Sequence, residues 1–301
     1  MDNFKNTVIV VLSSVILVQS IFLVYFIFRG RRAPVSIHVQ KKAADDPLLK
    51  RERFSEPAKP VAVEKKVTIK DRPVKSAGKI ALVLDDWGYN LKNRDFITGN
   101  DYHISVSVLP FKAYSATIAR LAHDKNKDVI IHMPMEPESK GSYGLEENTL
   151  LTSMSRSDID KILTRAFDDI PYAKGLSNHM GSEATQNRRL MVIVMEFLKA
   201  NNLFFLDSFV TSKSVCGGCA KKTVVPIARR DVFIDNENDS AYIRKQVKEL
   251  AHKAEVSGLA VGIGHDRPAT ISVLQEVIPE LLEQGFEFVN ISEIIDSSRS
   301  R

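Results

Sequence analysis

One short apolar run constrains the fold of this chain more than any other segment. Residues 80–84 (Ile-Ala-Leu-Val-Leu) are consecutive apolar residues, most of them branched, and the run ends at Asp85 and Asp86. Such a run predicts a β-strand buried on both faces, as in a parallel sheet covered by helices. Two adjacent carboxylates at the end of a buried strand lower the free energy of unfolding unless a metal ion binds them or a proton neutralises one of them. The pair therefore indicates either an active site at the carboxyl end of the strand, or solvated acids that cap a turn or a helix.

Short apolar runs alternate with amphipathic segments through the rest of the chain. The alternation repeats about seven or eight times after residue 79, which is typical of βα units. A polar residue stands at the end of nearly every apolar run, and this spacing favours an α/β barrel over an open sheet. The predicted strands are 80–84, 104–109, 129–131, 175–182, 203–206, 232–234, 259–263 and 286–289, and the predicted helices are 112–124, 157–169, 185–200, 241–256 and 270–284.

The beginning of the chain predicts a membrane anchor within residues 1–28. Residues 8–28 are apolar except for three serines and one glutamine, which is long enough to span a bilayer as a helix. A cleavable signal peptide would have a shorter apolar core and a small-residue cleavage site, whereas a run of arginines follows here. We therefore expect one uncleaved transmembrane helix.

Residues 29–78 have the composition of a disordered basic linker. They contain five prolines and no sustained periodicity. Residues 29–79 carry 15 Lys and Arg against 6 Asp and Glu, and residues 1–28 carry one charge of each sign, so the total of +5 leaves −4 for residues 80–301. A mildly acidic folded part argues against a nucleic-acid partner. The basic linker is better suited to the anionic headgroups of a membrane.

Polar side chains at the predicted strand ends would converge at one rim of a barrel. Two imidazoles and a carboxylate are a common ligand set for a catalytic divalent metal, beside which water becomes a nucleophile near neutral pH. A lone histidine is more often structural, and we interpret His103, His123 and His252 in that way because they lie at strand starts or on helix faces. The strand-end candidates are Asp85, Asp86, His132, Glu136, Asn178, His179, Asp207, His265 and Asp266, of which Asp207 can equally cap the turn after its strand.

Cys216 and Cys219 form a single CxxC in the loop after Asp207. Without a second pair, a four-thiolate zinc site within this chain has no support. We expect a local disulfide that staples the loop. A redox site is the weaker interpretation, because no strand-to-helix redox context surrounds the pair.

Four motifs resemble the divergent polysaccharide deacetylases, which are relatives of the chitooligosaccharide and peptidoglycan deacetylases. The motifs are Leu84-Asp-Asp-Trp-Gly88, His132-Met-Pro-Met-Glu-Pro137, Gly175-Leu-Ser-Asn-His-Met-Gly-Ser182 and Gly262-Ile-Gly-His265. They occur in order and with sensible spacing. The resemblance covers residues 79–296 and implies a distorted (β/α)7 barrel, with 297–301 as a tail.

The resemblance also implies roles for the strand-end residues. Asp85 would be the general base and His265 the general acid that protonates the leaving amine. Asp86 and His132 would be metal ligands, and zinc is the expected ion. The second histidine of the family's metal motif is replaced by Glu136.

The third metal ligand is consequently either Glu136 or His179. We expect His179, which stands directly at its strand end, with Glu136 as a neighbouring or substrate contact. The Arg-Pro motif that the family carries after its fourth strand is absent, and Asn178-His179 stands there. Trp87 is a candidate sugar-stacking face, although a Trp beside a turn is equally often a packing residue. The predicted substrate contacts are Trp87, Glu136, Asn178, Asp207 and Asp266.

The implied function is metal-dependent deacetylation of an N-acetylated cell-envelope polysaccharide, such as peptidoglycan or a similar glycan. The alternative is a non-catalytic glycan-binding or envelope-assembly protein on a retained barrel, because Glu136 and the missing Arg depart from the family pattern. The positive-inside rule, which compares Lys5 with the arginines after residue 28, places the domain in the cytoplasm. The family's envelope substrates and the expected disulfide favour the opposite orientation. We expect a single-pass membrane protein with its catalytic domain on the periplasmic side.

Overall fold

The computed structural model describes residues 76–139 and 144–299. The predicted anchor (1–28), nearly all of the predicted linker (29–78) and the last two residues of the tail lie outside these ranges. The described residues all belong to one compact unit. Within them, no helix is long and apolar enough to cross a membrane. The transmembrane helix therefore stays a prediction.

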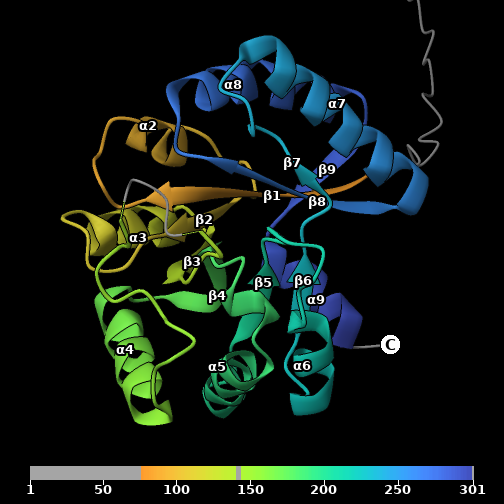
Figure 1. The fold of residues 1–301 in the computed structure, drawn as a ribbon. Helices are drawn as coiled ribbons and strands as arrows, with labels where there is room; N and C mark the ends of the chain where they lie inside the picture. Colours follow the sequence, from red (N-terminus) through yellow and green to blue (C-terminus); the bar gives the residue numbers. More distant parts are fainter. Residues whose placement is uncertain (1–75, 140–143, 300–301) are drawn as a thin grey trace, which may run out of the picture. The chain divides into compact units, whose positions relative to one another are not determined.

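The described residues form one sheet in which all strand pairs are parallel (Figure 1). The strand order is β6-β5-β4-β3-β2-β1-β8-β7, and β9 also pairs with β1. The strands are β1 (Gly78–Trp87), β2 (Ser105–Val108), β3 (Asp128–Met135), β4 (Ala173–Met180), β5 (Phe204–Asp207), β6 (Ile227–Arg229), β7 (Val232–Phe233), β8 (Leu259–His265) and β9 (Phe286–Val289).

β1 is the central strand of the sheet because it has three partners. β8 pairs along residues 79–85 of β1, β9 pairs with residues 78–81, and β2 pairs with residues 83–87. The pairings with β8 overlap both of the others, so β9 and β2 must share the opposite edge of β1. The carboxyl half of β1 thus lies between β2 and β8, which brings the ends of these three strands together.

The sheet curls into a partly closed barrel. Its outermost strands, β6 and β7, are joined by only Arg230 and Asp231, so their ends cannot lie far apart. The Arg230 amide donates to the Asp207 carbonyl at 3.1 Å, and the Asp231 amide donates to the Val261 carbonyl at 2.8 Å. This connector therefore bridges β5 and β8. The parallel barrel-like architecture agrees with the α/β barrel predicted from the alternating pattern.

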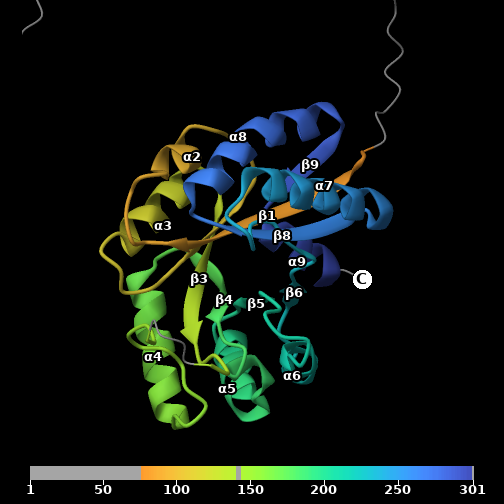
Figure 2. The same ribbon diagram turned by 45° about the horizontal axis from the view of Figure 1, so that its top comes forward.

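The α-helices other than α9 cover the outer face of the curled sheet (Figures 1 and 2). In both views α7 and α8 lie on the side of β1 and β8, whereas α4, α5 and α6 lie on the side of β3 to β6. The helices are α2 (Arg94–Thr98), α3 (Ser115–Asp124), α4 (Arg156–Asp169), η1 (Ala184–Gln186), α5 (Arg188–Ala200), α6 (Cys216–Thr223), α7 (Ser240–Ser257), α8 (Pro268–Glu283) and α9 (Ile291–Arg299).

Strand alternation divides the core into two apolar groups. Ile80, Leu82 and Leu84 of β1 pack into the large group between the sheet and the helices. Ala81 and Val83 pack into a smaller interior group, which Ile291 and Ile295 of α9 join. Since successive side chains point to opposite faces of a strand, the next residue in the interior row of β1 is Asp85. The same rule continues the interior row of β3 to His132 and that of β8 to His265.

Three helices and one strand were not predicted from the sequence. They are α2, α6, α9 and β6, and each of them is short. α6 contains the CxxC, so the cysteines lie on a helix and not in a loop. Both Cys216 and Cys219 are buried free thiols, and the expected disulfide is not formed in the structure.

Candidate metal centre

An irregularity at the end of β1 turns Asp86 toward the barrel interior. The pairing of β1 with β2 shifts register between Leu84 and Trp87, and Asp86 has φ +66°, in the left-handed region. Asp tolerates this region better than most residues, and such bulges often redirect a side chain beside an active site. Regular alternation would point Asp86 away from Asp85. The bulge instead brings both carboxylates to the same rim.

Asp86, His132 and His179 form a compact set of metal-capable donors. Asp86 Oδ1 lies 3.3 Å from His132 Nε2 and 3.1 Å from His179 Nδ1. The two ring nitrogens lie 3.2 Å apart. Donors that hold a tetrahedral zinc at about 2.0–2.1 Å are themselves about 3.3 Å apart, so the spacing fits zinc.

The Asp86 carboxylate also carries an unsatisfied buried oxygen. Its Oδ1 has no hydrogen-bond partner among the described residues, although it faces both imidazoles. An orphaned carboxylate oxygen between two histidines is the arrangement that a divalent cation would complete. The residues present therefore fit a metal ion.

Gly181 lets the chain turn sharply after His179. It has φ +86°, and a Cβ at this position would lie 2.9 Å from Met135 Cβ. A larger residue here would displace the end of β4 and His179 with it.

The two neighbouring carboxylates differ in pKa. Burial alone would raise the pKa of Asp86, but the adjacent imidazoles of His132 and His179 outweigh it and hold the pKa well below its ordinary value. Asp86 is therefore ionised, as a metal ligand must be. The Asp85 side chain is 1% exposed, and this burial raises its pKa, although His132 and His265 partly offset the effect.

His265 is held on the other side of the cluster by a buried carboxylate. Its Nδ1 lies 2.8 Å from Oδ1 of Asp235, which is fully buried. The second Asp235 oxygen accepts from the His265 amide at 2.8 Å and from Thr270 Oγ1 at 2.7 Å. Burial would lower the pKa of His265, but the Asp235 carboxylate outweighs it and raises the pKa. His265 Nε2 faces Asp86 Oδ2 at 4.0 Å, so a proton on this nitrogen points toward the cluster.

Comparison with known proteins decides the family. The family model of the divergent polysaccharide deacetylases matches residues 82–295. This chain belongs to the divergent polysaccharide deacetylase family.

Two curated relatives each match about two thirds of the chain. The uncharacterized protein YibQ of Escherichia coli (strain K12) is 40% identical over 205 residues, which are 68% of this chain and 64% of YibQ, so the match spans less than two thirds of that relative. An uncharacterized protein of Haemophilus influenzae (strain ATCC 51907 / DSM 11121 / KW20 / Rd) is 38% identical over 205 residues, 68% of this chain and 72% of that protein. The crystal structure of an uncharacterized protein from Agrobacterium tumefaciens C58 has a TM-score of 0.70 and 20% identity over 74% of this chain and 91% of that one, which shows the fold alone.

Trp87 cannot be the sugar-stacking residue predicted from the sequence. Beyond the bulge it pairs with Val108 and is 0% exposed within the outer core. Tyr89, two residues further on, is 48% exposed and takes the rim position instead. Its hydroxyl donates to Glu146, which also accepts from Lys112. The Lys112 ammonium lies 5.0 Å from the centre of the Tyr89 ring.

Glu136 is engaged away from the donor cluster. Its Oε2 accepts hydrogen bonds from the amide and the hydroxyl of Thr152, both at 2.7 Å. These bonds close the base of the loop between β3 and α4. His179, in contrast, lies within the cluster, so the geometry favours the predicted choice of His179 as third ligand.

Asn178 and Asp207 also form local contacts and are not brought to the cluster. The Asn178 carboxamide accepts from the Ser208 amide at 2.9 Å and donates to the Met180 carbonyl at 2.8 Å. Asp207 caps its turn by accepting from the Phe209 amide at 2.8 Å and from Ser214 Oγ at 2.7 Å. The capping interpretation of Asp207 therefore describes its position.

Asp266 lies at the rim beside the cluster. Its Oδ1 accepts from Asn93 Nδ2 at 2.6 Å. Burial and the nearby negative charge of Asp86 raise its pKa, and Asn93 partly opposes them. Of the predicted substrate contacts, Asp266 is therefore the one that shares the electrostatic environment of the cluster.

Sequence reasoning missed Asp235 and the rim residues Tyr89 and Glu146. It also missed the buried Ser177, which lies 2.8 Å from His132 Nδ1, and Ser107, which lies 2.9 Å from Ser177. Asp235 had a detectable signal, because it follows the predicted strand 232–234 as the other candidates follow theirs. Ser107 and Ser177 had no such signal, since a serine within an apolar strand is not marked by its position as a functional residue.

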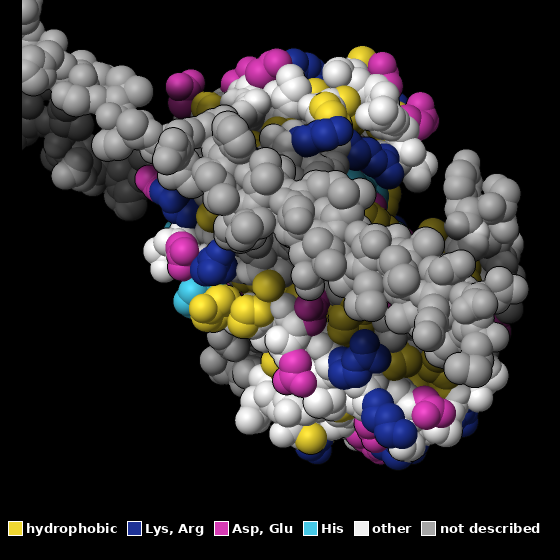
Figure 3. Space-filling model, turned by 90° about the vertical axis from the view of Figure 1, so that its left-hand side faces the viewer, with side chains coloured by type: hydrophobic (Ala, Val, Ile, Leu, Met, Phe, Trp, Pro, Cys, Tyr) yellow, Lys and Arg dark blue, Asp and Glu magenta, His cyan; other side chains and the backbone are white. Residues whose placement is uncertain are grey.

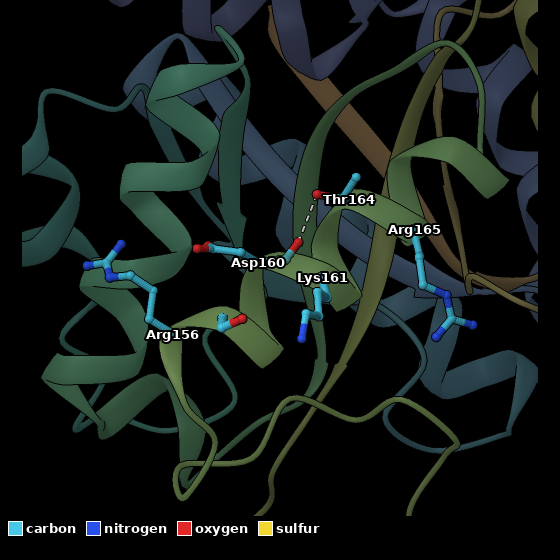
Figure 4. A pocket seen from close by; sticks show the side chains of 6 residues that line it. Arg156, Asp160, Lys161, Thr164 and Arg165 are labelled. Carbon is cyan, nitrogen blue, oxygen red and sulfur yellow. Dashed lines mark hydrogen bonds between the residues drawn. The ribbon is translucent and has the colours of Figure 1, made fainter.

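Other surface features lie apart from the cluster. A hollow of about 810 Å³ is lined by six described residues, all on α4, and none of them belongs to the cluster (Figure 4). Arg156 and Arg165 lie at its opposite ends, and Thr164 Oγ1 donates to the Asp160 carbonyl at 2.8 Å. On the face shown in Figure 3, basic and acidic side chains of the described residues are interspersed.

Proposed function

We propose that the protein is a metal-dependent deacetylase that hydrolyses the acetamide groups of an N-acetylated cell-envelope polysaccharide. One observation carries the proposal: Asp85 and the His265–Asp235 pair flank a set of three donors spaced for a tetrahedral metal. A base, an acid and a Lewis-acid site within one rim are the groups that amide hydrolysis requires. The family membership of the chain supports the same reaction class.

Each residue of the site has a separate role in the proposed hydrolysis. Zinc, when held by Asp86, His132 and His179, supplies Lewis-acid polarisation and lowers the pKa of water. Asp85 accepts a proton from the attacking water as the new C–O bond forms, and its raised pKa makes it a stronger base. His265 donates its Nε2 proton to the amide nitrogen as the C–N bond breaks. The products are acetate and the free amine of the sugar.

The rim supports a substrate with both apolar and polar faces. Tyr89 follows the Asp86 strand and is 48% exposed, and Met180 follows His179 and is 45% exposed. Sugar rings present apolar C–H faces to such side chains and hydroxyl groups to neighbouring acids. We assign Tyr89, Glu146 and Asp266 to glycan contact.

We further propose a membrane-anchored organisation for the whole chain. Residues 8–28 would span the membrane, and 29–78 would tether a (β/α)7 barrel, 79–296, on the periplasmic side. The apolar run and the envelope substrate support this arrangement. Fusion of the carboxyl terminus to reporters active only outside or only inside the cytoplasm tests it, and activity of the cytoplasmic reporter alone would overturn it.

The activity test uses purified full-length protein loaded with zinc. We expect about one zinc per chain by elemental analysis, and acetate release from N-acetylglucosamine oligomers or peptidoglycan. Asp85→Asn should retain zinc and lose acetate release by roughly 10²–10⁴-fold. A protein that stays metal-free in excess zinc and releases no acetate contradicts the proposal. Glycan binding without acetate release would instead establish the non-catalytic alternative.

A further inference from the structure

Two buried hydroxyl groups form a hydrogen-bonded pair beside a proposed metal ligand. Ser177 Oγ lies 2.8 Å from His132 Nδ1, and Ser107 Oγ lies 2.9 Å from Ser177 Oγ. All three residues are at most 2% exposed, so solvent does not compete for these bonds.

The register of the sheet explains why the two serines meet. β3 lies between β2 and β4, and Ser177 of β4 is the direct partner of His132. Ser107 of β2 is paired with Ile130, whose side chain packs in the barrel interior. Both hydroxyls therefore lie on the interior face, beneath His132 and on either side of its strand.

The proposed role of His132 as a metal ligand determines which atom donates in each of these hydrogen bonds. His132 Nε2 faces Asp86 and His179, and a nitrogen that binds a metal must present a lone pair. The ring proton of neutral His132 is then on Nδ1, which donates to Ser177 Oγ. Ser177, having accepted, donates its own proton to Ser107.

We propose that Ser177 and Ser107 form a directional hydroxyl relay that holds His132 in its Nδ1–H tautomer. The proposal rests on the proposed function for the identity of the ligands. The two serines are positioning residues, since they act through His132. Because a hydroxyl can accept one proton and donate another, Ala breaks the relay at either position, whereas Thr preserves the hydroxyl.

Zinc affinity of the full-length protein, measured by competition with a chromophoric chelator, tests the relay. Ser177→Ala should bind zinc about 10–100-fold more weakly than wild type, and Ser177→Thr should recover most of the loss. Ser107→Ala should have a smaller effect that disappears in the Ser177→Ala background, because it is transmitted through Ser177. Additive effects of the two substitutions, or wild-type affinity in Ser177→Ala, would overturn the relay.

Ser105→Ala is the matched control. Ser105 is on the same strand as Ser107, is 0% exposed, and accepts a hydrogen bond from the Ile291 amide at 3.0 Å. The Ser105→Ala substitution removes a buried hydroxyl of equal size and leaves Ser107 and Ser177 in place. We expect unchanged zinc affinity, and a loss equal to that of Ser177→Ala would show that the effect is merely structural.

Nitrogen-15 NMR of the histidine side chains in the metal-free protein separates this inference from the proposed function. The chain has only seven histidines, and His132→Gln assigns the resonance. Neutral His132 should be the Nδ1–H tautomer in wild type and should shift toward Nε2–H in Ser177→Ala. The Nε2–H tautomer in wild type would overturn the relay. A wild-type protein with the expected tautomer but no zinc binding would contradict the proposed function alone.

Discussion

The Nδ1 atom of His265 lies 2.8 Å from Oδ1 of Asp235, a carboxylate with no solvent exposure. This contact orients the imidazole so that Nε2 faces the Asp86 carboxylate. It also keeps the ring protonated at a higher pH than a free imidazole, because the Asp235 charge outweighs the burial of His265. The pair thus accounts for how a partly enclosed histidine can serve as an acid near neutral pH.

Asp235→Asn tests the catalytic consequence of this contact. We expect a fall in kcat of roughly 10²–10⁴-fold, because the amide neither fixes the tautomer nor stabilises the imidazolium. The alkaline limb of the kcat profile should also move to lower pH. Asp231→Asn is the control, since Asp231 accepts the Val261 amide at 2.8 Å and does not contact His265. Equal losses in both variants would contradict the assignment.

The same pair predicts a pH dependence of stability in the metal-free protein. The pKa of His265 is raised in the folded state, so its contribution is complete below the unfolded value and is lost as pH rises through the folded value. The free energy of unfolding of wild type minus that of Asp235→Asn should therefore shrink as pH rises above about 6.5. Urea titrations of both proteins at several pH values measure this difference in the free energy of unfolding. A difference that grows with pH would refute the sign.

His179 and Glu136 are distinguished by metal binding. His179→Ala should lower zinc affinity by at least about 100-fold, because it removes one of three protein donors. Glu136→Ala should retain zinc but lose about 1–2 kcal/mol of stability, since the Thr152 amide and hydroxyl lose their acceptor. Elemental analysis and urea unfolding measure the two effects. Zinc loss in Glu136→Ala with full occupancy in His179→Ala would reverse the ligand assignment.

Trp87 and Tyr89 should respond to truncation in opposite ways. Trp87→Ala should cost about 3–5 kcal/mol of stability, because it leaves a cavity in the outer core. Tyr89→Ala should leave stability nearly unchanged and raise KM about tenfold at constant kcat, as expected when binding energy common to substrate and transition state is lost. Unfolding curves and steady-state kinetics check both. A Tyr89→Ala variant with unchanged KM would remove Tyr89 from the substrate contacts.

Lys127 provides a second pH test, remote from the metal centre. Its side chain is 3% exposed, and Nζ donates to Asn100 Oδ1 at 3.0 Å and to the Tyr102 carbonyl at 2.7 Å. Burial lowers its pKa from 10.5 to about 8. Between these values the unfolded chain binds the proton that the folded chain has released, so stability rises with pH.

The expected rise for Lys127 is about 2–3 kcal/mol across that window, measured against Lys127→Met by chemical unfolding. The exposed Lys245 serves as the control, because it is not one of the charges that shift Lys127, and Lys245→Met should leave the pH dependence of wild type intact. A wild-type curve parallel to that of Lys127→Met would contradict the prediction.

The local sequence pattern was sufficient to place several candidate site residues at the ends of strands. Asp85, His132 and His265 each continue the interior row of an apolar strand, and period-two alternation places such residues without knowledge of the neighbours. The apolar runs also identified most strands and helices of the barrel. The motifs around these residues were enough to recognise the family.

Trp87 and Asp86 show where alternation fails. A bulge adds a residue to one strand without changing the pattern of apolar and polar letters, so it cannot be read from periodicity. The bulge inverted the expected orientation of both residues, burying Trp87 and turning Asp86 to the rim. Tyr89 became exposed for the same reason.

The sequence by itself determined which strands end in chemically capable residues, because that information is local. Only the tertiary structure decided which of them meet. The contacts that decide this join segments that are separated in the chain. They are the contact between His265 and Asp235, the relay from His132 through Ser177 to Ser107, and the hydrogen bonds from Thr152 to Glu136. Such pairings depend on strand order and on the curl of the sheet, which arise from the packing of the whole core and not from any one segment.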